Sequence, residues 1–200
     1  MSLQDVFIEE LRDLYSAENQ LIKALPKVGK AASNRELKAL LTQHLDETKG
    51  QVQRLKQVFE LLGKKPTGQH CKGMEGVIEE GKEAIESDEE SATKDVQLTG
   101  AALRVEHYEI AGYSAAIAIS KALGQKEISD LLNETLTEEK NAAKNITTQS
   151  KPILAEAKSE EGAAEEEDDD EPQDAEEAGS RKKSEQDEAE AQPGMRKSTQ

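Results

Sequence analysis

The sequence lacks the features that mark secreted or membrane proteins. Its 200 residues include one cysteine, Cys71, which excludes a disulfide within the chain and suits a reducing compartment. No run approaches the roughly 18 apolar residues that a membrane-spanning helix needs. The amino terminus has no basic region followed by an apolar one, as a signal peptide would have. We therefore expect a cytoplasmic protein without membrane contact.

Basic residues are also in short supply. The chain has 26 Lys and Arg against 42 Asp and Glu, which gives a formal net charge of −16. Binding to a nucleic-acid backbone requires clustered Lys and Arg, so we expect no nucleic-acid partner. Most of the acidic excess lies from Glu156 onward, and the rest of the chain is ordinary in charge.

Aromatic residues are scarce, with no tryptophan, three tyrosines and two phenylalanines. A helical core of Leu, Ile, Val and Ala does not need them. Apolar residues recur at helical spacing from Leu3 to about Ala157, and no run alternates as a strand would. The predicted helices span residues 2–32, 34–62, 74–85, 92–123 and 125–157. We expect the short third one to cross one end of a bundle formed by the four others.

Glycine, proline and capping residues mark the predicted helix ends. Pro26 predicts a kink or break in the first helix, and Pro152 a late interruption of the last. The segment Ser33–Glu36 matches a capping box at the start of the second helix. Gly63 and Gly124 are placed to end the second and third long helices.

Four long helices with one extended crossover favour a ferritin-like four-helix bundle over a simple up-and-down bundle. Residues 158–200 are almost devoid of apolar side chains and cannot offset the entropy lost on folding. The predicted organisation is therefore all-α, with a bundle domain over 1–157 and a disordered acidic tail over 158–200.

Acidic residues interrupt the apolar stripes of the long helices. Glu18, Glu106 and Glu139 each share a face with apolar residues, and Glu47 lies at the edge of its stripe. An ionised carboxylate inside a bundle is costly unless it is paired or bound to a cation. One acid on each of four helices predicts a cage for two metal ions, as in di-iron and di-manganese bundles. Glu109, one turn after Glu106, is expected as an extra ligand.

Other polar residues near these stripes have plainer interpretations, and each acid can also be an exposed edge residue. Tyr113 is expected to donate a hydrogen bond to a ligand. His44 is interpreted as a partner of the cage rather than a direct ligand. The pattern leaves open whether Glu138 or Glu139 faces inward. Cys71 and the adjacent loop histidine lack the spaced partners of a zinc site, so both are interpreted as structural.

Several motifs, in order over roughly residues 1–156, carry a family resemblance. They are Leu3–Phe7, Glu10–Leu21, Lys23–Lys27, His44–Val52, Cys71–Gly76, Glu106–Tyr113 and Thr135–Lys140. Together they resemble the YciE/YciF family of bacterial ferritin-like proteins. The resemblance implies a ferritin-like fold, dimerisation and expression linked to stress, with no settled biochemical activity.

The resemblance also places the four stripe acids at metal-ligand positions. In relatives of the rubrerythrin type, a histidine follows the acids of the second and fourth helices by three residues. Here those positions hold Gly50 and Ala142, and Ala143 stands where many family members have a further acid. These departures favour a weaker or remnant metal site.

Two functions follow from these observations, and the sequence leaves both open. The first is a stress protein that holds two iron or manganese ions, with oxidoreductase chemistry at open metal positions and Tyr15, Tyr108 or Tyr113 as donors. The second is a metal-free, dimeric helical scaffold with a degenerate site, whose acidic tail recruits basic protein partners. A weaker third interpretation makes the tail a nonspecific cation binder. No enzymatic activity is assigned.

Overall fold

The structure is a computed structural model that describes residues 1–67, 69–88 and 92–168. Its helices are α1 (Leu3–Ala31), α2 (Arg35–Leu61), α3 (Lys72–Glu86), α4 (Ala92–Ala122) and α5 (Lys126–Asp168). The described residues form no strand, which confirms the predicted all-α fold. Within the same residues, no helix is long and apolar enough to cross a membrane.

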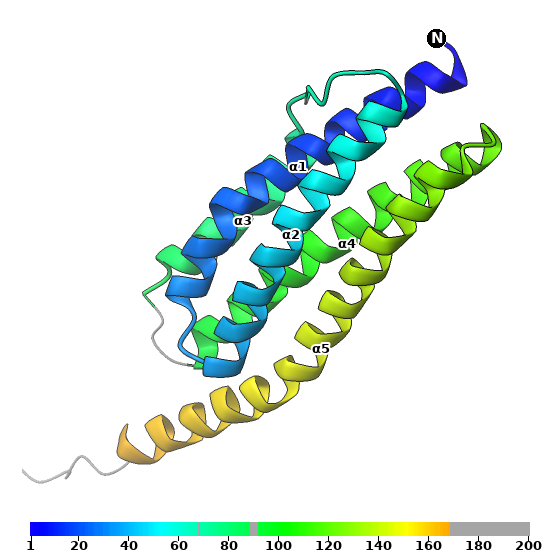
Figure 1. The fold of residues 1–200 in the computed structure, drawn as a ribbon. Coiled ribbons are helices and arrows are strands. Elements are labelled where there is room, and N and C mark those ends of the chain that lie inside the picture. Colours follow the sequence, from blue (N-terminus) through cyan, green and yellow to red (C-terminus); the bar gives the residue numbers. More distant parts are fainter. Residues whose placement is uncertain (68, 89–91, 169–200) are drawn as a thin grey trace, which may run out of the picture.

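The four long helices form two hairpins, α1 with α2 and α4 with α5, joined through α3 (Figure 1). The helix α3 runs lengthwise beside α1 and α4, so the prediction that it crosses one end of the bundle is wrong. The reason is that Met74, Gly81 and Ala84 form a buried stripe along its length. By running back along the bundle, α3 supplies the extended crossover of the predicted ferritin-like arrangement.

Helix ends follow local sequence, with one correction at the start of α2. Asn34, not Ser33, caps α2, because its side-chain oxygen accepts two backbone N–H groups of the first turn. Ser33 instead donates its backbone N–H to Asp95 of α4 at 2.9 Å. Gly63 and Gly124 adopt φ values of 64° and 71° after α2 and α4, which confirms both as helix-ending residues.

Neither interior proline ends its helix. α1 continues through Pro26 to Ala31, and α5 continues through Pro152 to Asp168. A break at Pro26, one of the two predicted alternatives, and the predicted interruption at Pro152 are therefore both wrong. Buried neighbours, Leu25 and Ile153, anchor both helices at these points. Packing on the core therefore keeps the chain helical where a proline alone would favour a helix end. In Figure 1, α5 changes direction in its second half, the part that contains Pro152.

The helix α5 also passes the predicted domain boundary at residue 157. Residues 158–168 are helical, so the tail predicted from 158 does not start as irregular chain. Most of these residues are good helix formers, and residues 158–162 are exposed. Over residues 158–162, the extension therefore reflects helix propensity rather than core packing. The remainder of the predicted tail, 169–200, lies outside the described residues.

The core consists of two apolar clusters, one toward each end of the bundle. One contains Leu21, Leu25, Leu37, Leu41, Leu98 and Ile146, and the other contains Phe7, Leu11, Leu55, Phe59, Ile117 and Leu132. On every long helix the chain passes from one cluster to the other near mid-length. The buried residues Glu18, His44, Glu106, Glu109 and Glu139 lie at those crossing points, whereas buried Asp95, Thr99, Ser120 and Ser129 lie nearer the helix ends.

Candidate metal centre

The buried polar layer receives side chains from all four long helices. Glu18, Glu109 and Glu139 are 0% exposed, Glu106 is 1% exposed and His44 is 3% exposed. Glu18 comes from α1, His44 from α2, the pair Glu106 and Glu109 from α4, and Glu139 from α5. Residues three or four apart share a helix face, so each of these side chains points into the bundle with its apolar neighbours.

Four of these side chains converge on one point. His44, Glu106, Glu109 and Glu139 each offer a ligand atom, and these atoms all lie within 4.8 Å of one another. We call these four residues the Glu–His cluster. His44 Nε2 lies 3.2 Å from Glu106 Oε1 and 4.0 Å from Glu109 Oε2. A single divalent ion could contact one atom from each residue.

Many polar atoms of this layer have no hydrogen-bond partner. They include both ring nitrogens of His44, Oε2 of Glu106, both oxygens of Glu109 and Oε2 of Glu139. Although His44 Nε2 is near Glu106, the contact lacks the geometry of a hydrogen bond. Buried polar atoms without partners are rare and costly in proteins. Their convergence indicates that something else satisfies them.

Glu18 lies beside the Glu–His cluster and is held by Tyr113. The Tyr113 hydroxyl donates a hydrogen bond to Glu18 Oε1, while Glu18 Oε2 has no partner. The charge of Glu18 contributes to raising the pKa values of Glu106 and Glu109, after burial and alongside Glu139. Tyr113 therefore donates a hydrogen bond to one of the acids, as the sequence predicted.

The electrostatics of the layer disfavour ionised carboxylates. Burial is the main cause that raises the pKa values of Glu18, Glu106, Glu109 and Glu139, and repulsion among the acids adds to it. Burial also raises the pKa of Tyr113. Shared protons or a bound cation are the two ways to keep so many acids in one dry layer.

The structure resolves which of two neighbouring acids faces inward. Glu139 is buried, while Glu138 is 30% exposed and ion-paired with Arg54 at 2.9 Å. Gln51 joins the two, because its amide donates to Glu139 Oε1 and, at 3.1 Å, to Glu138 Oε2. Gln51 thereby orients Glu139 and leaves its second oxygen unpaired.

Glu47, which the sequence placed among the ligands, is not brought into the Glu–His cluster. Its side chain is 29% exposed and accepts a hydrogen bond from Gln43 at 2.9 Å. His44, with Nδ1 3.8 Å away, lowers the pKa of Glu47. His44 takes the inward place on α2 instead and is 3% exposed. The available signal was the spacing Leu41, His44, Thr48, Gln51 and Leu55, all of which are buried.

Cys71, Tyr15 and Tyr108 are not members of the Glu–His cluster. The buried Cys71 caps α3 by accepting the N–H of Met74, and its Sγ lies 3.0 Å from Asp13 Oδ2 and 2.9 Å from Tyr108 Oη. The Tyr15 ring packs edge-on against a phenylalanine. These contacts agree with a structural role for Cys71.

The donor set suits a transition-metal ion. Carboxylate oxygens are preferred by manganese, and imidazole together with carboxylate is found with iron and zinc. The Glu–His cluster supplies three carboxyls and one imidazole, and its unpaired atoms are free to coordinate. The residues present therefore fit a divalent metal ion, without selecting among these metals.

Known proteins resemble this chain over nearly the whole bundle. Residues 2–159 match the family model described as domain of unknown function DUF892. Protein YciF of Escherichia coli strain K12 is 46% identical over 140 residues, which are 70% of this chain and 84% of that protein. The resemblance to the YciE/YciF family is thereby confirmed.

Solved structures agree with this match. The crystal structure of the E. coli stress protein YciF has a TM-score of 0.75 at 42% identity and covers 77% of this chain and 98% of its own. YcfI from Rhodopseudomonas palustris has a TM-score of 0.72 at 42% identity and covers 74% and 94%. A protein from Xanthomonas campestris pv. campestris, with a TM-score of 0.61 and 21% identity, supports the fold alone.

Proposed function

The chain belongs to the DUF892 family, and on this premise we propose that it is a cytoplasmic, stress-associated protein that binds divalent iron or manganese inside its bundle. The Glu–His cluster would hold one ion, and Glu18 would supply a further carboxylate toward a second. The association with stress rests on the relative described as the E. coli stress protein YciF.

One observation supports this proposal above the others. Oxygens of Glu106, Glu109 and Glu139 and both nitrogens of His44 converge within a buried layer and lack hydrogen-bond partners. Leaving such atoms unpaired costs about 1–3 kcal/mol each. A divalent cation would satisfy them together and offset the repulsion among the acids.

The surrounding residues would prepare the site for an ion. Tyr113 fixes one oxygen of Glu18, and Gln51 fixes one oxygen of Glu139, so that in each case the second oxygen is free. Apolar clusters flank the layer on both sides. A bound iron or manganese ion would supply Lewis acidity and, for iron, one-electron redox chemistry.

Metal analysis of protein purified without chelator tests the proposal. We expect wild-type protein to retain or take up iron or manganese, and Glu106→Gln to bind the same metal at least about tenfold more weakly. Glu134→Gln on α5 is the matched control, because that carboxylate is 63% exposed. Equal metal affinity for Glu106→Gln and wild type, or no uptake by either, would contradict the proposal.

The metal-free scaffold is the second candidate, and one contact favours it. The Gln51 amide already donates a hydrogen bond to Glu139 Oε1, a carboxylate oxygen that would otherwise be free to bind a metal ion. If iron and manganese leave the melting temperature of wild-type protein unchanged, the scaffold is the better explanation. The homodimer and the basic partners of the tail stay predictions, which sedimentation and pull-down with truncated chain would check.

A further inference from the structure

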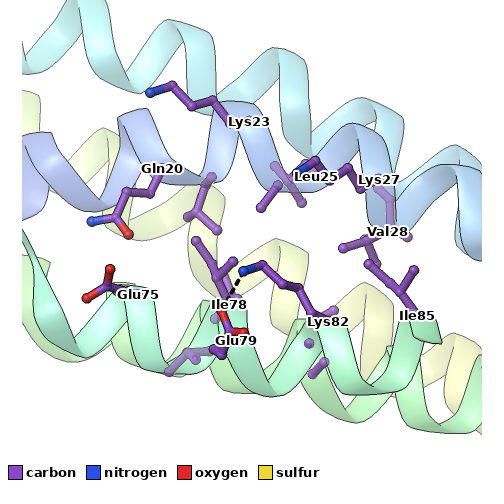
Figure 2. A pocket seen from close by; sticks show the side chains of 18 of the residues that line it. Gln20, Lys23, Leu25, Lys27, Val28, Glu75, Ile78, Glu79, Lys82 and Ile85 are labelled. Carbon is purple, nitrogen blue, oxygen red and sulfur yellow. Dashed lines mark hydrogen bonds and ion pairs between the residues drawn. The ribbon is translucent and has the colours of Figure 1, made fainter. Parts of the chain in front are cut away.

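A cavity lies next to the Glu–His cluster. It has a volume of about 260 Å³ and is lined by residues of α1, α3 and α4, with one residue of α2. Figure 2 shows Leu25, Val28, Ile78 and Ile85 along its walls. Glu106 also lines it, so the cavity borders one residue of the Glu–His cluster.

Small residues and helix spacing give the cavity its shape. Gly81 of α3 and Ala101 of α4 line it, and a Cβ atom on Gly81 would lie 3.7 Å from Ala101 Cβ. The α1 side of the lining runs from Gln20 to Val28, which is about 12 Å of helix. The cavity is therefore a long slot rather than a round chamber.

The lining indicates an aliphatic ligand. Among the described residues, no Phe, Tyr or Trp lines the cavity, and most of its walls are Leu, Val, Ile and Ala. An apolar cavity of about 150 Å³ is enough for benzene. The larger volume here therefore accommodates a chain of about eight to ten carbons.

Among the polar residues of the lining, Glu106 is the buried one. The others are partly or fully exposed, namely Gln20, Lys23, Lys27, Glu75, Glu79 and Lys82. Glu106 Oε2 is buried and has no hydrogen-bond partner, and the side chain is 1% exposed. A ligand hydroxyl that reached this oxygen could donate a hydrogen bond to it. An ionised carboxylate head could not donate, and it would meet three further acids behind Glu106, namely Glu18, Glu109 and Glu139.

We propose that this slot binds an unbranched aliphatic alcohol of about eight to ten carbons, with the hydroxyl at Glu106 and the chain between α1 and α3. The proposal does not depend on metal binding, because the slot and Glu106 are present in the protein itself. Lys82 and Glu79 form an ion pair at the rim of the slot (Figure 2). The hydrocarbon chain of the alcohol would end on this side.

Calorimetric titration of metal-free wild-type protein with 1-alcohols tests the proposal. We expect saturable 1:1 binding that tightens about three- to fourfold per added methylene and levels off near ten carbons. Octanoate and heptyl methyl ether, which lack a donor group, should bind about five- to tenfold more weakly than 1-octanol. Absence of saturable 1-octanol binding, or equal binding of octanoate or the ether, would overturn the assignment.

A variant whose slot is filled by a larger side chain provides a second test of the proposal. Ala24 lines the cavity and is half-buried on α1, so Ala24→Leu should fill the slot without disturbing the fold. We expect this variant to bind 1-octanol at least about tenfold more weakly. Ala111→Leu makes the same change at an exposed position of α4 outside the lining, and should bind as wild type does. Circular dichroism melts confirm folding, and unchanged binding by folded Ala24→Leu would place the ligand elsewhere.

Discussion

Replacing Glu109 by glutamine exchanges a buried carboxyl for an amide of nearly the same shape. Both Glu109 oxygens lack partners, and burial together with the charges of Glu18, Glu139 and Glu106 raises the pKa of this residue. In the metal-free protein, the amide removes that repulsion and can donate hydrogen bonds to neighbouring carboxylates. We therefore expect Glu109→Gln to be more stable than wild type without metal.

The size of the effect follows from the burial of the site. Replacing a buried ion pair by well-packed neutral residues is often stabilising by about 1–4 kcal/mol, and we expect this range for Glu109→Gln at a pH where the Glu109 carboxyl is ionised. For a domain of this size, each kcal/mol shifts the melting temperature by about 2–4 °C. Metal at about 100 times its dissociation constant should raise wild-type stability by about 2.7 kcal/mol. A variant that has lost a ligand should lose most of that gain.

Thermal unfolding followed by circular dichroism measures both effects. With chelator, Glu109→Gln should melt about 2–16 °C above wild type. With manganese or anaerobic ferrous iron, wild type should gain about 5–11 °C and the variant little. Glu134→Gln, at an exposed position of α5, should follow wild type in both conditions. A variant that melts below wild type in chelator, or that gains as much from metal, would refute this account of Glu109.

Three further perturbations have expected outcomes. Raising the pH from about 5 to about 8 should lower the melting temperature of the metal-free protein, because the buried acids have folded-state pKa values above their unfolded value of about 4.3. The stability that they contribute is complete below that value and is lost as the pH rises through the folded pKa values, which melts across pH would reveal. Gly73→Ala should cost about 1–3 kcal/mol in chemical denaturation, because its Cβ would lie 2.5 Å from the Tyr108 ring, whereas Gly76→Ala, in open space, should cost nothing. Glu47→Gln should leave metal stoichiometry unchanged by elemental analysis, since Glu47 lies outside the Glu–His cluster.

The apolar spacing of the sequence predicted the helices well because helical periodicity is a local property. Residues three and four apart share a face whatever the rest of the chain does, and glycine adopts positive φ wherever a helix must stop. Gly63 and Gly124 were therefore predictable. Pro26 and Pro152 were not, because buried neighbours on both helices outweigh the lost hydrogen bond.

The acids of the site were recognisable for the same local reason, except on α2. Glu18, Glu106 and Glu139 interrupt stripes that are otherwise apolar, and all three are buried. On α2, a stripe through Leu45 and a stripe through His44 and Gln51 both have helical spacing. The second is the buried one, which turns His44 inward and leaves Glu47 partly exposed.

The sequence by itself determined the helices, most of their ends and which carboxylates would be costly to bury, because these depend on residues close together in the chain. Only the tertiary structure decided that α3 runs lengthwise, that His44 rather than Glu47 joins the three acids, and that an aliphatic slot reaches Glu106. Those outcomes depend on the rotation of each helix about its axis. That rotation is set by packing between helices that are far apart in sequence.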